Sequence, residues 1–399
     1  MSCAERILFL YLDTGNGHAG PARLLERAVK ERAGKKRDVR VFVQHGFAPS
    51  NRAQRFFYES GYRLSVRYLN AAYSLFYEMT KPFCVLHVLA FFLARRNSLY
   101  IKNLIRSLEI THIVCFHFAV TPAIVAALKS LRKKIPLTIT VTDPFTAHPA
   151  WFLYNKCTSL PIRYAVFSEQ MEQTARTVYG IRTCCVFPFI VAPEFFVRSA
   201  ERIGGDVKVF KVLIAGGGEG LACAEKLVRR FIRSTGGGGR RQSGRVEPCT
   251  PNGQKNDCRL EVSVVCARNR RQYRRLKALA AQFPDFPLRL YGFVGNMSEL
   301  LGASDCLIAK AGASTVFEAQ ASGTPLIITG FVHGQEIGNV RYAVSTGGAV
   351  FIRSISAIAQ KVFELARKKN GTPAKDYTGA VTGSYAGSYA LADFICAEV

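Results

Sequence analysis

A histidine lies in a glycine-rich stretch close to the start of the chain. Residues 13–20 read DTGNGHAG and connect an apolar run at 7–12 to a helical pattern that begins at Pro21. Glycines allow a tight turn and close approach of a ligand, and the helix that follows offers unpaired N–H groups. The spacing fits neither the G-x-G-x-x-G of a dinucleotide site nor the Gly-Lys-Ser/Thr of a P-loop. Gly17 and His18 are therefore candidates for some other chemistry.

A second candidate site follows a predicted buried strand at 305–309. The sequence continues KAGASTVFEAQ, which predicts a turn of small residues and then a helix that begins at Ser314. Free N–H groups and a hydroxyl cap at a helix start suit a phosphate group. Glu318 shares a helical face with Ser314 and could bind both hydroxyls of a ribose, or it could simply compensate the helix dipole. The small and hydroxyl residues of this turn are Gly312, Ala313, Ser314 and Thr315.

Two further predicted strand ends carry suitable groups. A polar cluster follows the strand at 325–329, at the edge of an open α/β sheet where ligands bind. Its side chains suit sugar hydroxyls. The strand at 288–291 is followed by Gly292, Phe293 and Val294, where an aromatic ring and free backbone suit a flat base. The polar cluster comprises Gly334, Gln335, Glu336 and Asn339.

Alternating strands and helices position these residues. Apolar runs at 6–12, 39–43, 112–116 and 137–141 predict buried parallel strands, and the rhythm resumes at 209–215 after a looser segment. The fold class is α/β, with two Rossmann-like domains whose parallel sheets face an interdomain cleft. The expected domains are 1–195, 206–372 and a C-terminal tail at 373–399, with a flexible insertion at 234–258.

Composition limits the possible partners. The 399 residues are 49% hydrophobic, which is enough for a sizeable core, and 54 Lys and Arg against 28 Asp and Glu give a net charge of +26. Such a charge attracts polyanions such as nucleic acid or an anionic membrane face. The twelve cysteines lack zinc-site spacing, and the N-terminus is a poor secretory signal. We expect reduced cysteines, no metal site and a cytosolic compartment.

Taken together, these motifs resemble the GT-B glycosyltransferases of the family that contains monogalactosyldiacylglycerol synthases and bacterial diacylglycerol glucosyltransferases. The resemblance covers most of the chain. Its residues are Gly15 to His18, Thr140 to Asp143 with His148 to Phe152, Gly216 to Gly220, Cys266 to Asn269, Gly292 to Val294, Lys310 to Glu318, and Gly334 to Glu336 with Asn339.

The resemblance implies that the C-terminal domain binds UDP-galactose or UDP-glucose as a co-substrate, with no separate cofactor. Uracil would lie near Phe293 and Val294, and ribose on Glu318. The diphosphate would lie at Ala313, Ser314 and Thr315, and the hexose on Gln335 and Glu336. Gly217 and Gly218 of the glycine loop are further substrate-binding candidates. The acceptor would be diacylglycerol, which enters from the N-terminal domain.

The resemblance also gives His18 a role. A neutral imidazole there would take the proton of the acceptor hydroxyl as that hydroxyl attacks the anomeric carbon, with inversion of configuration. Arg268 and the helix N-terminus would offset charge on the departing UDP. Asp143 either orients His18 or is itself the base, and the sequence does not separate these roles.

The region 52–106 combines many aromatic side chains with basic ones and has three interpretations. Its aromatics form core and its charges a solvated face, or it binds nucleic acid, or it lies on an anionic membrane with Phe83 to Ala94 at the headgroup boundary. The apolar run from Phe83 to Ala94 is too short to span a bilayer. A lipid acceptor favours the membrane interpretation, so we expect peripheral attachment to the inner face of the cell membrane and no nucleic acid.

Two other functions stay open. One is an N-acetylglucosaminyltransferase that acts on a polyprenyl-linked peptidoglycan precursor, although Gly334 to Glu336 with Asn339 looks closer to the glycolipid synthases. The other is a UDP-sugar sensor without turnover. No residue distinguishes galactose from glucose as the donor, or one added sugar from two.

Overall fold

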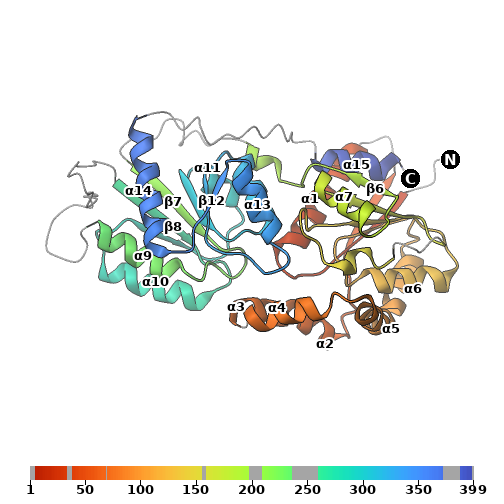
Figure 1. Ribbon diagram of the computed structural model, residues 1–399. Coiled ribbons are helices and arrows are strands. Elements are labelled where there is room, and N and C mark those ends of the chain that lie inside the picture. The colour runs from red at the N-terminus through yellow and green to blue at the C-terminus, as the bar shows by residue number, and fades with distance from the viewer. Residues whose placement is uncertain are drawn as a thin grey trace. The chain divides into compact units, whose positions relative to one another are not determined.

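The computed structural model describes residues 5–33, 38–68, 70–154, 159–196, 209–235, 259–371 and 387–397. The chain forms two compact units (Figure 1). Unit 1 comprises residues 1–191, 332–339 and 383–399, and unit 2 comprises 192–331 and 340–382. The expected insertion therefore lies, from residue 236 on, outside the described residues.

Unit 1 is built on a six-stranded sheet in the order β2-β1-β3-β4-β5-β6, with every neighbouring pair parallel. Its central strands β1, β3, β4 and β5 are largely buried, because helices cover both faces of the sheet, whereas the edge strands β2 and β6 are only partly buried. The strands are β1 (Glu5–Tyr11), β2 (Val39–His45), β3 (His112–Cys115), β4 (Leu137–Thr140), β5 (Ile162–Val166) and β6 (Cys184–Val186).

The helices of unit 1 fall into two groups. A helical segment made of α2 (Arg52–Arg55), the π-helical turn η1 (Phe56–Gly61), α3 (Tyr62–Tyr68), α4 (Asn70–Met79) and α5 (Phe83–Ser107) connects β2 to β3. The others are α1 (Asn16–Ala33), α6 (Thr121–Leu131), η2 (Pro149–Phe152), α7 (Glu169–Thr177) and α15 (Gly387–Ala397). Helix α1 starts at Asn16, not at Pro21 as the sequence suggested, because Gly15 makes the turn with φ of 123° and the proline is tolerated inside the helix.

Helix α5 has one buried face, which packs on α6. Leu86, Leu93, Asn97 and Ile101 lie on that face, and Asn97 accepts a hydrogen bond from the backbone N–H of Ala48. Among the described residues, α5 is the helix long and apolar enough to cross a membrane by length and composition. The sequence analysis considered only the apolar run at 83–94, which is too short to span a bilayer. The helix that contains this run continues to Ser107.

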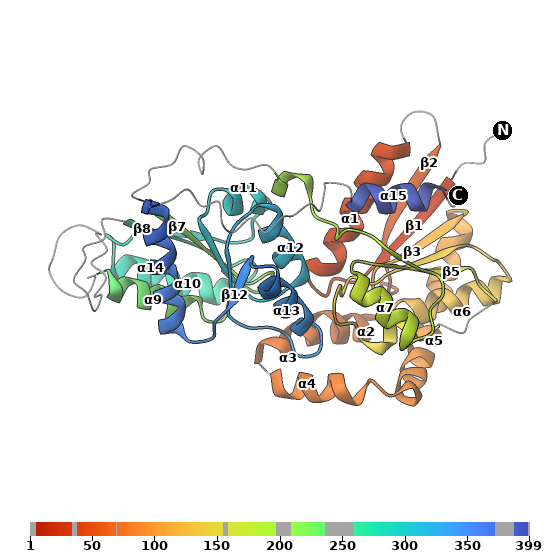
Figure 2. The same cartoon turned by 45° about the horizontal axis from the view of Figure 1, so that its top comes forward.

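Helix α15 belongs to unit 1, although the sequence analysis left residues 373–399 as a tail. It lies beside α1 in both views (Figures 1 and 2). Tyr389 donates a hydrogen bond to Glu31, and Asp393 pairs with Arg32 at 3.2 Å. The backbone of Gly387 approaches the carbonyls of Pro188 and Phe189 so closely that a Cβ there would lie 2.7 Å from the former.

Unit 2 repeats the plan with a six-stranded parallel sheet in the order β12-β11-β10-β7-β8-β9. Its strands are β7 (Val209–Ala215), β8 (Arg259–Val265), β9 (Leu288–Tyr291), β10 (Cys306–Ala309), β11 (Leu326–Ile328) and β12 (Ala349–Phe351). Its helices are η3 (Pro193–Phe196), α9 (Ala224–Ser234), α10 (Arg270–Gln282), α11 (Met297–Gly302), α12 (Ala313–Ala321) and α14 (Ile355–Gly371), and α13 (Ile337–Ser345) begins in unit 1 and ends in unit 2. The two predicted parallel sheets are confirmed.

Each sheet has one point at which the strand order reverses. In unit 1 it lies between β1 and β3, and in unit 2 between β7 and β10. In open α/β sheets, ligands bind at the carboxyl ends of the strands beside such a point. The loops after β1 and β3, and those after β7 and β10, are therefore where binding residues are expected.

Candidate functional site

His18 is held in the first turn of α1, directly after β1. Its Nδ1 lies 2.8 Å from the carbonyl oxygen of Phe116 and 2.8 Å from the hydroxyl of Thr142. A carbonyl only accepts, so Nδ1 carries the proton and Nε2 has the free lone pair. Burial lowers the pKa of His18 to about 4, against a smaller opposing effect of the bond to Phe116. The side chain is thus neutral at physiological pH and can accept a proton at Nε2.

Asp143 follows β4 and accepts a hydrogen bond of 2.9 Å from the indole N–H of Trp151. Burial raises its pKa to about 7, and the charge of Glu336 acts in the same direction. The sequence analysis left open whether this carboxyl orients His18 or is the base. The structure gives the orienting contacts to Phe116 and Thr142 instead.

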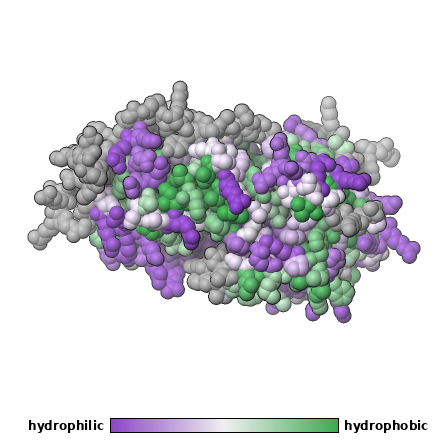
Figure 3. Space-filling model, in the orientation of Figure 1, coloured by the Kyte–Doolittle hydropathy of each residue, from purple (hydrophilic) through white to green (hydrophobic). Residues whose placement is uncertain are grey.

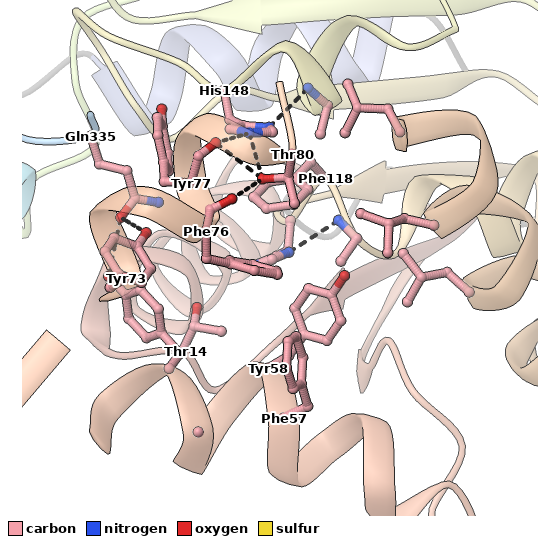
Figure 4. A pocket seen from close by; sticks show the side chains of 18 of the residues that line it. Thr14, Phe57, Tyr58, Tyr73, Phe76, Tyr77, Thr80, Phe118, His148 and Gln335 are labelled. Atoms are coloured by element: carbon pink, nitrogen blue, oxygen red, sulfur yellow. Dashed lines mark hydrogen bonds between the residues drawn. The ribbon is translucent and has the colours of Figure 1, made fainter. Parts of the chain in front are cut away.

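His18 borders a cavity of about 290 Å³ in unit 1 (Figure 4). Most of its wall is apolar or aromatic, contributed by the helical segment from η1 to α5 and by the loops after β3 and β4. Tyr58 lies on this wall, and burial raises its pKa to about 12, so its hydroxyl stays protonated. The wall also contains His117, His148 and Gln335.

The loop 332–339 reaches this cavity from far along the chain. Tyr62 and Tyr73 donate hydrogen bonds of 3.2 and 3.0 Å to the side-chain oxygen of Gln335, and Tyr77 donates one to the carbonyl of Gly334. Figure 4 shows Gln335 directed at Tyr73. Gly334 has φ of 78°, and a Cβ there would lie 2.2 Å from the ring of Tyr77, so only glycine fits.

The other side chains of the polar cluster, Glu336 and Asn339, are both buried. Glu336 is buried, and its Oε2 accepts the backbone N–H of Val332 at 2.7 Å. Asn339 is also buried, in the first turn of α13. Gly334, Gln335, Glu336 and Asn339 all belong to unit 1, whereas the residues expected at UDP belong to unit 2.

Unit 2 brings together the glycine loop after β7 and the turn after β8. Gly217 has φ of 70°, and the carbonyl of Gly218 accepts the backbone N–H of Arg268 at 3.1 Å. The guanidinium of Arg268 lies 5.6 Å from the ring centre of Phe293, which is 70% exposed and follows β9. An exposed ring with a cation beside it can stack on a flat base. Val294, the next residue in the sequence, is half-buried.

Helix α12 begins one residue earlier than predicted. Its N-cap is Gly312, which is extended and makes no side-chain cap bond, so the expected Ser314 hydroxyl cap is wrong. The first N–H groups of the helix, those of Ala313, Ser314 and Thr315, still lack partners within it. Burial raises the pKa of Glu318 to about 8.

Sequence reasoning missed several residues of the site. The tyrosines that hold Gln335 were visible only as part of an aromatic-rich region. His117, Trp151 and His148 were also not singled out for roles of their own. A usable signal was the position of His117 directly after a predicted buried strand. Within the described ranges, three or more His, Cys, Asp or Glu side chains nowhere form a group that could hold a metal ion.

The fold and the two sets of residues define the class of protein as a glycosyltransferase of GT-B architecture. Residues 18–189 match the family model of monogalactosyldiacylglycerol (MGDG) synthase, and residues 243–380 match that of the glycosyltransferase family 28 C-terminal domain. Together these matches span more than three quarters of the chain. The N-terminal part of the chain is thus similar to the monogalactosyldiacylglycerol synthases and its C-terminal part to family 28 glycosyltransferases, as its motifs predicted.

Relatives with curated names extend this likeness over 90% of the chain. Monogalactosyldiacylglycerol synthase 1, chloroplastic, of Arabidopsis thaliana is 28% identical, and the probable synthase of Nicotiana tabacum is 30% identical. The chain spans 64% of the length of each.

Solved structures share the fold. The MurG of Acinetobacter baumannii has a TM-score of 0.58 at 15% identity, over 98% of this chain and 99% of that one. A glycosyltransferase of Rickettsia africae has a TM-score of 0.56 at 15% identity, over 99% and 97%.

Proposed function

We propose that this protein transfers galactose or glucose from a UDP-sugar to the free hydroxyl of 1,2-diacylglycerol, with inversion at the anomeric carbon. The observation that carries the proposal is the cavity of unit 1, an apolar chamber with a neutral imidazole in its wall. Acyl chains favour such walls, and an alcohol needs a base beside them. The names of the relatives support the same lipid and sugar.

The donor is assigned to unit 2. Uracil stacks on Phe293 beside Arg268, and the diphosphate lies against the unpaired N–H groups of α12 and the loop with Gly217 and Gly218. Ribose hydroxyls donate to Glu318. Gln335 and Glu336 stay candidates for the hexose, although the side-chain oxygen of Gln335 already accepts two tyrosine hydroxyls, which leaves its NH₂ group as donor.

The proposed reaction is a single displacement. The acceptor oxygen forms a bond to the anomeric carbon as the bond from that carbon to the UDP oxygen breaks, and the hydroxyl proton passes to Nε2 of His18. UDP leaves with the electron pair, and its charge is offset by Arg268 and the N-terminus of α12. The step balances because His18 takes the proton and UDP takes the electron pair.

A surface of unit 1 suits attachment to a membrane. We define the docking face as the exposed apolar side chains of η1, α4 and α5: Phe56, Phe57, Leu75, Phe76, Met79, Phe83, Val88, Phe91, Phe92 and Leu99. Exposed Arg95 and Arg96 lie among them on α5. Figure 3 shows hydrophobic side chains gathered over the region where α5 lies in Figure 1. Apolar side chains beside cations are the pattern of an interfacial helix on anionic lipid.

Replacing Phe91 and Phe92 together by glutamate tests the docking face. Each ring is more than half exposed, at 59% and 55%, so the substitution leaves the core intact while it adds repulsion from anionic lipid. Sedimentation with vesicles that contain phosphatidylglycerol is expected to lose most of the bound protein. Val178→Glu, at a side chain 67% exposed beyond the end of α7, is the matched control and should sediment like the wild type. Equal loss in both variants would contradict a specific face.

The transfer itself is tested with purified protein, diacylglycerol in mixed micelles and labelled UDP-galactose or UDP-glucose in parallel. A labelled monoglycosyl lipid is expected from one donor, unchanged by EDTA. If UDP binds but neither donor gives product, the diacylglycerol assignment fails. The next acceptor to assay is then a polyprenyl-linked peptidoglycan precursor with UDP-N-acetylglucosamine, and binding without any turnover would indicate a sensor.

A further inference from the structure

A second histidine borders the same cavity as His18. His117 follows β3, so it lies across the strand-order reversal from the loop after β1. Its side chain is 3% exposed, and its ring centre is 4.6 Å from that of His18. A buried imidazole of this kind is either satisfied by its neighbours or available to a ligand, and its hydrogen bonds decide which.

The hydrogen bonds of His117 fix its tautomer. The backbone N–H of Ala119 donates to Nδ1 at 3.1 Å, so this nitrogen carries no proton. Burial, together with the nearby His18 and His45, holds the pKa of His117 well below its usual range. The ring is therefore neutral and carries its proton on Nε2. Among the described residues, that nitrogen has no hydrogen-bond partner.

His148 shows what the same local arrangement looks like when it is satisfied. The backbone N–H of Ala150 donates to its Nδ1 at 3.2 Å, two residues on as at His117. Its Nε2, however, lies 3.4 Å from the carbonyl of Tyr77 and 3.3 Å from the hydroxyl of Thr80 (Figure 4). His148 is thus hydrogen-bonded at both nitrogens. His117 has the same backbone contact at Nδ1 but lacks a partner for its Nε2–H among the described residues.

We propose that the Nε2–H of His117 donates a hydrogen bond to the attacking hydroxyl of the acceptor, while Nε2 of His18 accepts the proton of that hydroxyl. The two rings have complementary tautomers, one a donor and one an acceptor at Nε2. Their separation allows one oxygen to lie within hydrogen-bond distance of both. The inference rests on the proposed function, because it assigns a second contact to the same acceptor group.

The pair would act in the displacement as follows. As the oxygen–carbon bond forms and the hydroxyl proton moves to His18, the oxygen passes through a state with partial negative charge. The bond from His117 strengthens at that stage, and His117 keeps its proton throughout. It also directs the remaining lone pair of the hydroxyl oxygen at the anomeric carbon.

Two substitutions separate this role from a structural one. His117→Asn retains an acceptor near the Nδ1 position for Ala119 but removes the donor at Nε2. His117→Gln retains an amide donor near the Nε2 position and removes the acceptor for Ala119. We expect kcat for transfer to fall about 10²- to 10³-fold in His117→Asn, with KM for the UDP-sugar unchanged, and to recover largely in His117→Gln. The melting temperature of His148→Gln, compared with that of His148→Asn, measures the cost of losing the Nδ1 contact alone.

The outcomes are decisive in both directions. If His117→Gln is the less active variant, or if His117→Asn transfers at the wild-type rate, His117 has only a structural role. If the wild type transfers no sugar to diacylglycerol, the proposed function fails, which is a separate result. Nitrogen NMR of the histidine-labelled wild type gives the tautomer of His117, whose signals are those absent from His117→Asn. A His117 proton on Nε2 whose signal shifts on addition of diacylglycerol supports the proposal, and a His117 proton on Nδ1, or an unshifted signal, overturns it.

Discussion

His18→Asn is expected to lower kcat for hexose transfer by about 10²- to 10⁴-fold, the range for loss of a well-placed general base. Asparagine keeps a donor for the carbonyl of Phe116 and for contact with Thr142, so the local fold is retained. Binding of UDP should be unaffected because the residues proposed for uracil, ribose and diphosphate lie in unit 2. Single-turnover transfer and isothermal titration with UDP measure the two effects. A variant that binds UDP and transfers at the wild-type rate would exclude His18 as the base.

The pH dependence of kcat at saturating donor distinguishes His18 from Asp143. A base must be unprotonated, so the rate falls on acidification through the pKa of the group that acts. The pKa of His18 is about 4, and that of Asp143 is about 7. With His18 as base the rate is expected to stay level from neutral pH down to nearly 4. A loss centred on pH 7, together with a larger loss in Asp143→Asn than in His18→Asn, would assign the base to Asp143.

Glu318→Gln is expected to weaken UDP-sugar binding by about 1.5–3 kcal/mol at alkaline pH, which is the range for hydrogen bonds to a charged group. The pKa of Glu318 is about 8 in the free protein. Only the carboxylate can accept from both ribose hydroxyls, so binding must release a proton at pH values below 8. The dissociation constant of the wild type should therefore fall as pH rises from about 6 to about 9.

The variant should remove that pH dependence and match the wild type near pH 6, where the wild-type carboxyl is already neutral. UDP-glucose is a suitable probe because both of its phosphates are diesters. Glu299→Gln, at an exposed carboxylate on α11, is the control and should retain the wild-type profile. If Glu318→Gln retains the pH dependence, Glu318 does not bind the ribose.

The sequence predicted the sheets well because their central strands are buried and mostly apolar. The run Val209–Ala215 is apolar almost throughout and coincides with β7. The sequence predicted the first residues of helices less accurately. Pro21 looked like a first helical residue, but the preceding glycine already makes the turn, and α1 starts five residues earlier. The same limit applies at α12, where the glycine cap replaced the expected hydroxyl.

The candidate site was predictable in its parts but not in its contacts. His18 and Asp143 stood out by type and position, yet their partners, Thr142 and Trp151, follow only from how the loops after parallel strands meet. The contact between Tyr73 and Gln335 joins residues 262 positions apart, and no local pattern encodes such a pair. Different residues of region 52–106 fit different interpretations. Tyr73 and Tyr77 are buried, as core residues are, whereas Phe91 and Phe92 are exposed, as the membrane interpretation requires.

Helix α15 has a consequence for how the chain is made. Unit 1 contains both the first strands and residues 387–397, and the helix that carries His18 packs against this last segment. During synthesis the ribosome must therefore release all of unit 2 before α1 can acquire its final neighbour. The N-terminal unit is completed last. A gene cut between residues 191 and 192 would yield a first fragment that lacks α15 and the loop 332–339, so supplying residues 387–397 in trans should raise its stability.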